Sequence, residues 1–129
     1  MAFHEDWLIR QIQMVTESIA RLMWGTDLPT YHVREDASAT DVDRTARAID
    51  ALLREKRVND AEDLLFAALD PDNRDSLLLA LDFYSRLNAL TDGELEAAGF
   101  SREEIDSGLR EAVDRFGLTA VLPKENLDY

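Results

Sequence analysis

Residues 3–24 read FHEDWLIRQIQMVTESIARLMW, and apolar side chains recur along them at alternating steps of four and three. This spacing gathers apolar side chains on one side of an α-helix, so it predicts a long amphipathic helix. The predicted central stripe consists of Leu8, Ile12, Val15, Ile19 and Leu22. We expect this stripe to pack against the body of the protein.

The apolar surface of this helix extends beyond the central stripe on both sides. Trp7 and Met14, which are one heptad apart, widen it on one side, and Met23 widens it on the other. The apolar arc is about twice the roughly 100° that packing against one core requires. We therefore predict a second contact, with another chain. The candidate interface residues are Trp7, Met14, Met23 and Trp24, and the alternative is a place in the core.

The order of helical start and stop signals predicts a single domain that spans residues 1–129. We expect a long N-terminal helix over 4–24, a crossing segment over 25–40, a helical body over 41–117 and a tail over 118–129. Strand signals are almost missing. The predicted fold class is therefore all-α, a compact bundle of five to six helices whose short connections favour antiparallel neighbours.

Capping boxes predict where the helices of the body begin, because a hydroxyl residue is followed three positions later by an acidic one. These boxes are Thr40 with Asp43, Thr91 with Glu94, and Ser101 with Glu104. The run over 77–81 is apolar on all sides, which predicts a central helix. Gly108 lies inside a predicted helix, where the missing side chain favours close approach of a neighbour.

Composition narrows the classes of function. The chain has 129 residues, no cysteine and a net charge of −13. Residues 1–34 hold four acidic and three basic side chains, so twelve of the thirteen net negative charges fall on residues 35–129. A surface this negative repels phosphates, which argues against nucleic acid and anionic membranes as partners. The absence of cysteine and of an N-terminal signal pattern favours a cytoplasmic location.

Residues 59–71, NDAEDLLFAALDP, resemble the second helix of a tetratricopeptide repeat. In that repeat two small residues stand seven apart, here Ala61 and Ala68, with a large apolar residue between them at Leu65 and a proline near the end at Pro71. The resemblance implies an antiparallel helical hairpin. Since stable arrays need three or more repeats, we expect one repeat-like hairpin within a compact domain.

Two further stretches carry a resemblance that spans nearly the whole chain. They are EDWLIRQIQMVTESIARLMWG over 5–25 and LTDGELEAAGFSREEIDSGL over 90–109. Both are similar to a family of small, acidic, all-helical bacterial proteins that is catalogued as a domain of unknown function. The resemblance implies a helical fold and a bacterial cytoplasmic origin, and it implies no activity.

No motif predicts catalytic residues, a cofactor or a metal. The acidic turn over 70–75 starts like a calcium-binding loop but has Asp75 where that loop needs glycine and Leu81 where it needs glutamate. His4 and His32 are the only histidines, without metal-ligand spacing. Glu94 and Glu104 stand where carboxylates close capping boxes. We expect the protein not to be an enzyme.

Our leading hypothesis is a non-enzymatic protein-interaction module, with homodimerisation through the N-terminal helix as one form of it. A small-molecule-binding or catalytic domain is the alternative, with a pocket near segment 25–40 lined by Tyr31, His32 and Tyr84. A third hypothesis is an acidic mimic that occupies a nucleic-acid-binding partner. These hypotheses differ in what they require of the fold: an exposed apolar helix face, a lined cavity, or an acidic surface.

Overall fold

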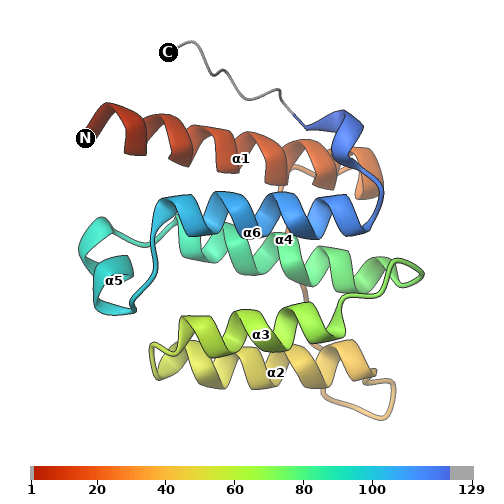
Figure 1. Ribbon diagram of the computed structural model, residues 1–129. Coiled ribbons are helices and arrows are strands. Elements are labelled where there is room, and N and C mark those ends of the chain that lie inside the picture. Colours follow the sequence, from red (N-terminus) through yellow and green to blue (C-terminus); the bar gives the residue numbers. More distant parts are fainter. Residues whose placement is uncertain (1, 123–129) are drawn as a thin grey trace.

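A computed structural model describes residues 2–122, which form six α-helices and one short 3-10 helix (Figure 1). The helices are α1 (Ala2–Trp24), α2 (Asp41–Arg54), α3 (Val58–Ala68), α4 (Arg74–Asn88), α5 (Asp92–Ala97), α6 (Arg102–Arg115) and η1 (Thr119–Val121). The expected all-α bundle of five to six helices is confirmed. Helix α1 begins two residues before the predicted 4–24. Of the predicted tail over 118–129, residues 123–129 lie outside the described part.

Local capping explains where the helices of the body begin. At Thr40, Thr91 and Ser101 the hydroxyl accepts from the backbone of the third helical residue, whose carboxylate accepts from the cap backbone in return. All three predicted capping boxes are therefore confirmed. At the other ends of helices, Gly25 and Gly99 have φ of 70° and 72°, a left-handed conformation that glycine adopts without steric cost.

The helices lie in three levels in Figure 1, with α1 above, α4 and α6 in the middle, and the α2–α3 hairpin below. Helix α4 packs against α1, α2, α3 and α6. Its side chains are buried on several sides, including Leu77, Leu81, Phe83 and Tyr84. The prediction of a central helix is confirmed, because a helix that is apolar all round needs protein neighbours on every side.

The crossing segment over 25–40 is held to the body through buried polar groups. The carboxylate of Asp43, at the start of α2, accepts hydrogen bonds from the Tyr31 hydroxyl at 2.7 Å and from the Arg34 amide at 3.1 Å. The amide of Tyr31 donates to Asp82 on α4 at 3.3 Å. Although it lacks regular secondary structure, the segment therefore has a defined path over the bundle.

Arg102 connects three helices at one end of the bundle. Its side chain is buried and donates to the carbonyl oxygens of Asn88 at 2.8 Å and Leu90 at 2.6 Å, and to the carboxylate of Asp92 at 3.1 Å. These carbonyls lie at and just beyond the last residue of α4, where backbone acceptors lack partners within the helix. A side chain from the start of α6 thus completes the end of α4 and fixes α5 beside it.

Candidate functional site

Helix α1 presents one face to the body and another to solvent. Ile12, Val15, Ile19 and Ala20 are fully buried on the inner face, which packs against α4 and α6. The Asn88 side chain on α4 donates to the Ile9 carbonyl at 3.0 Å and joins the two helices by a polar contact as well. The central stripe is therefore part of the core, as predicted, with one exception.

Leu22 is that exception. It was predicted to point inward with the rest of the stripe, but 58% of its surface is exposed. The reason is geometric. A stripe with a strict seven-residue repeat drifts by about 20° per heptad around a straight helix. By Leu22, two heptads after Leu8, the drift has carried the side chain off the core and onto the outer face.

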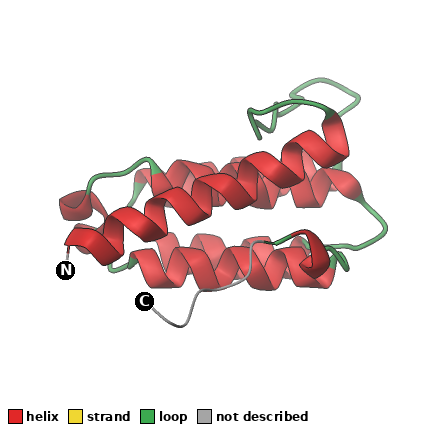
Figure 2. Ribbon diagram, turned by 90° about the horizontal axis from the view of Figure 1, so that it is seen from above, coloured by secondary structure: helices red, strands yellow, loops and turns green. Residues whose placement is uncertain are grey.

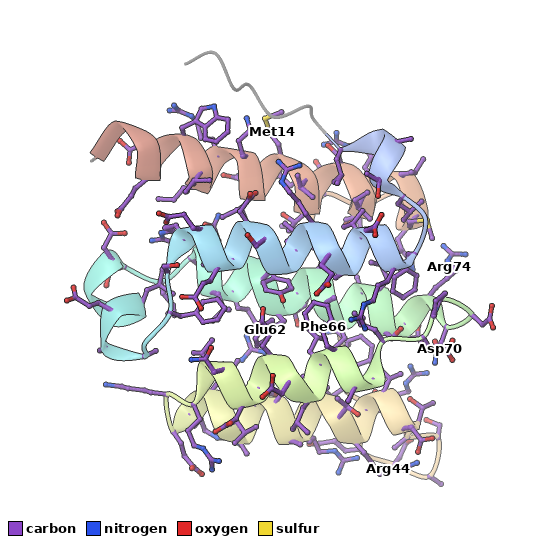
Figure 3. All side chains as sticks on the ribbon, in the orientation of Figure 1. Met14, Arg44, Glu62, Phe66, Asp70 and Arg74 are labelled. Atoms are coloured by element: carbon purple, nitrogen blue, oxygen red, sulfur yellow. The ribbon has the colours of Figure 1, made fainter. Side chains whose placement is uncertain are left out.

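The outer face of α1 carries Met14 and Leu22 as its exposed large apolar residues. Met14 is 48% exposed and points away from the rest of the bundle (Figure 3). Trp7 lies half-buried beside them, one heptad before Met14. Figure 2, which looks down on α1, shows none of the other helices crossing over it. We call Trp7, Met14, Ser18 and Leu22, with Gln11 between them, the outer ridge.

The other two predicted interface residues, Met23 and Trp24, do not belong to this ridge. Both are half-buried and pack against the hydrophobic core. The guanidinium of Arg74, at the start of α4, lies 5.5 Å from the centre of the Trp24 ring and also donates to the Met23 carbonyl. The face of an indole ring attracts a cation that lies over it in this way. Met23 and Trp24 thus pack the end of α1 against α4 and the core, away from the exposed ridge, and their assignment to an interface stays a prediction.

Charged residues flank the outer ridge on one side. Asp6, Arg10 and Arg21 are exposed, and Glu17 is half-buried. Arg21 forms an ion pair with Asp27 in the crossing segment at 2.6 Å. Glu17 accepts a hydrogen bond from the Gln13 side chain at 2.8 Å. Because the acidic and basic groups nearly balance, α1 is far less negative than the rest of the chain.

The predicted pocket lined by Tyr31, His32 and Tyr84 is not formed. The Tyr31 hydroxyl points to Asp43 on α2, whereas the Tyr84 hydroxyl points to Glu62 on α3. His32 is exposed. Tyr31 meets α4 at Asp82, which is two positions from Tyr84 and therefore on a nearly opposite side of that helix. The segment over 25–40 covers the bundle there without enclosing a cavity that these three side chains share.

Asp43 has a structural role that its place in a capping box indicated only in part. Burial disfavours its charged form, but hydrogen bonds from the Thr40 backbone, the Tyr31 hydroxyl and the Arg34 backbone outweigh this effect and hold its pKa well below the usual range. Burial and the neighbouring Asp43 carboxylate raise the pKa of Tyr31. One sign of this wider role is visible in the sequence: the acidic position of the box holds an aspartate, whereas most capping boxes have glutamate or glutamine there.

A hollow of about 580 Å³ lies between α3 and α6. On its floor the Tyr84 hydroxyl donates to the Glu62 carboxylate at 2.5 Å, directly under Gly108. Burial raises the pKa of Glu62 and of Tyr84. A β-carbon on residue 108 would overlap both polar groups, which confirms the predicted close approach. Figure 3 shows Glu62 and Phe66 facing this gap.

The hollow between α3 and α6 is acidic, because Asp63, Glu104 and Glu111 line it with Glu62. Its single basic side chain, Arg115, has its guanidinium 4.8 Å from the centre of the Phe66 ring. Within residues 2–122 no group of His, Asp and Glu side chains is arranged to hold a metal ion. Nor is any described helix both long and apolar enough to span a bilayer.

The structural role of Arg102 is one that the sequence did not predict. Arg102 stands at the first position of α6, where a positive charge opposes the helix dipole. That unfavourable placement was the only available signal. It becomes intelligible once the end of α4 is known to lie within reach of the guanidinium.

The composition and the fold are those of a small, acidic, all-helical protein, and its first helix carries an exposed apolar ridge. Residues 2–117 match the family of unknown function DUF6483, and the chain belongs to that family. Comparison with curated proteins and with solved structures found no match.

Proposed function

We propose that the protein is a non-enzymatic interaction module whose contact surface is the outer ridge of α1, and that the partner on this ridge is a second copy of the same chain. The observation that carries the proposal is the exposure of Met14 and Leu22 on a helix whose opposite face is fully buried. Methionine in particular is enriched at interfaces relative to the rest of a protein surface.

The distribution of charge favours α1 as the surface at which two copies of the chain would meet. Two chains with a net charge of −13 repel one another over most of their surfaces. Helix α1 carries only three acidic and two basic residues, so it is the face at which two copies meet with the least repulsion. A closed dimer with two-fold symmetry also buries the same ridge on both subunits.

The non-enzymatic part of the proposal is supported by the roles of the carboxylates. The side chains of Glu94 and Glu104 accept from the backbone of Thr91 and Ser101 at 2.9 and 3.1 Å. These bonds commit both groups to the capping of α5 and α6, away from acid–base chemistry.

We also propose that α2 and α3 form a tetratricopeptide-repeat-like hairpin and that the protein belongs in a bacterial cytoplasm. The burial of Ala61 and Leu65 at the contact of α3 with its neighbours supports the first idea. The absence of cysteine and the acidic composition support the second.

Sedimentation equilibrium over roughly 1 µM to 1 mM tests the proposed assembly, because a single helix face lies at the small end of interface sizes. We expect a monomer–dimer equilibrium for the full chain. Met14→Glu should shift it to monomer while the helical content stays the same. The matched control is Leu64→Glu, another exposed apolar residue, which lies on α3 and should not change the dimer. A chain that stays monomeric throughout, or a Met14→Glu chain that still dimerises, overturns the proposal.

A further inference from the structure

The charges along one flank of the outer ridge alternate in sign, so this flank is complementary to a second copy of itself that runs in the opposite direction. At about 100° per residue, Asp6, Arg10, Glu17 and Arg21 fall on one side of Met14. Their charges run negative, positive, negative, positive along the helix. Read from the other end, the order is positive, negative, positive, negative. Each charge therefore meets its opposite when this flank is laid against a reversed copy of itself.

We propose that two copies pair α1 against α1 in antiparallel orientation, about a two-fold axis that passes close to Met14; this inference rests on the proposed function. A two-fold axis perpendicular to a helix pair brings each flank against its own copy, so that residue i meets j and j meets i. Arg10 then lies opposite Glu17 of the second copy, and Asp6 lies opposite Arg21.

The apolar ridge specifies the same register as the charges. The midpoints of the pairs Asp6–Arg21 and Arg10–Glu17 both fall between Gln13 and Met14. The midpoint between Trp7 and Leu22, at the two ends of the ridge, falls between Met14 and Val15. These midpoints differ by one residue, or about 1.5 Å along a helix axis. One position of the axis thus places Met14 against its own copy and matches both ends of the ridge.

A parallel pair does not satisfy these charges. In parallel orientation the charged flank would face the opposite edge of the ridge of the second copy, where Leu8 and Val15 turn into the core and no charged side chain stands. The antiparallel pair is therefore favoured, because only in that orientation do the charged flanks of the two copies face each other.

The same four charges also form two pairs that are four apart along α1, Asp6 with Arg10 and Glu17 with Arg21, a spacing that supports pairs within one helix. Yet Arg21 pairs with Asp27, and Glu17 accepts from Gln13. Among the described residues, Asp6 and Arg10 take part in no ion pair. Exposed ion pairs and hydrogen bonds are worth about 0–1 kcal/mol, so the Arg21–Asp27 pair and the Gln13–Glu17 hydrogen bond are readily exchanged for contacts with a second copy.

Disulfide trapping in the full chain tests the orientation, because the protein contains no cysteine of its own. We would introduce Gln11→Cys and Ser18→Cys, one on each side of Met14. An antiparallel pair places these two positions opposite each other. It separates the two copies of Gln11 by about 9 Å, and those of Ser18 by about 12 Å, along the helix axis, beyond the reach of a disulfide.

We expect an equal mixture of the two variants to form mainly the mixed disulfide under mild oxidation, and each variant alone to form little. Met14→Cys should cross-link to itself in either orientation and reports only that α1 meets α1. Cross-linking of Met14→Cys together with self-cross-linking of Gln11→Cys and Ser18→Cys overturns the antiparallel register and leaves the proposed function standing. No cross-linking of any variant, with a monomeric wild-type chain, overturns both.

Charge exchange separates contacts between chains from contacts within one helix. Arg10→Glu and Glu17→Arg should each weaken the dimer about tenfold, since the two-fold axis repeats the affected pair. The double variant restores the attraction across the axis but places like charges four apart within each helix. We expect it to dimerise like the wild type. A double variant that dimerises no better than the single variants overturns the register.

Discussion

The hydroxyl of Tyr31 donates a hydrogen bond to the carboxylate of Asp43 over 2.7 Å, and both side chains are buried. The two residues belong to different parts of the chain, the crossing segment and α2. The same carboxylate caps α2 through the Thr40 backbone at 2.8 Å. One charged group therefore begins a helix and also holds the longest irregular segment of the described chain in place.

Replacement of Asp43 by asparagine should destabilise the protein by about 2 kcal/mol at neutral pH, because several buried donors lose a charged acceptor. Urea unfolding of the two proteins measures the difference. Asp41→Asn is the matched control, since Asp41 lies in the same first turn but is almost fully exposed. It should cost well under 1 kcal/mol. Equal effects of the two substitutions would contradict the role assigned to Asp43.

The contribution of Asp43 should also depend on pH. Its pKa in the folded state lies below that of the unfolded chain, near 3.9 for a free aspartate. The stabilisation is therefore fully present above the unfolded-state pKa and is lost as the pH falls through the folded-state pKa. The difference in unfolding free energy between wild type and Asp43→Asn should shrink below about pH 4. A difference that stays constant down to pH 2 would contradict this account.

Gly108→Ala should destabilise the protein by about 1–3 kcal/mol, although alanine is the better helix former. The added β-carbon overlaps the Tyr84 hydroxyl and the Glu62 carboxylate. Gly93→Ala is the control, because nothing lies within 4 Å of its added β-carbon. Tyr84→Phe removes one of the overlapping atoms, so the double variant should lose less stability than the two single variants added together. Strict additivity in thermal unfolding would argue against the overlap.

Arg102→Met should cost about 3 kcal/mol, because the carbonyls of Asn88 and Leu90 lose their donor at a buried helix end. Hydrogen exchange should rise first in the last turn of α4 and in α5, which the guanidinium joins. The control is Arg44→Met, which breaks an exposed ion pair with Asp41. Its effect should stay within about 0.5 kcal/mol. A uniform rise in exchange over the whole bundle would contradict a local clamp.

Replacement of Glu62 by glutamine should reduce the loss of folding stability that occurs as the pH rises. Burial raises the folded-state pKa of Glu62 above its unfolded value, so the fold is favoured when the group is protonated and loses stability as the pH rises through that pKa. Glutamine still accepts from Tyr84 without a charge. The stability of the variant relative to wild type should therefore increase from about pH 4 to pH 7. A difference in stability between Glu62→Gln and wild type that stays flat over this range would contradict the prediction.

Much of the fold could be predicted because its signals are local. The hydroxyl and acidic residues of the three capping boxes lie within four positions of each other, and so do the contacts that they make. The helical periodicity over 3–24 and the apolar run over 77–81 likewise depend only on the backbone repeat of the helix. The outer position of Met14 follows from the same repeat, since the step of about 100° per residue places it at the edge of the apolar arc and outside the central stripe.

The sequence by itself determined an all-helical chain, the starts of three helices after their hydroxyl caps, and a first helix with more apolar surface than one side can hold. Only the tertiary structure decided which apolar residues stay outside. Leu22 lies on the ridge because a straight helix lets the seven-residue repeat drift. Trp24 packs against the core, and Arg74, fifty positions later, lies over its ring. The partners of Asp43, Glu62 and Arg102 come from distant segments, and the packing of helices brings these together.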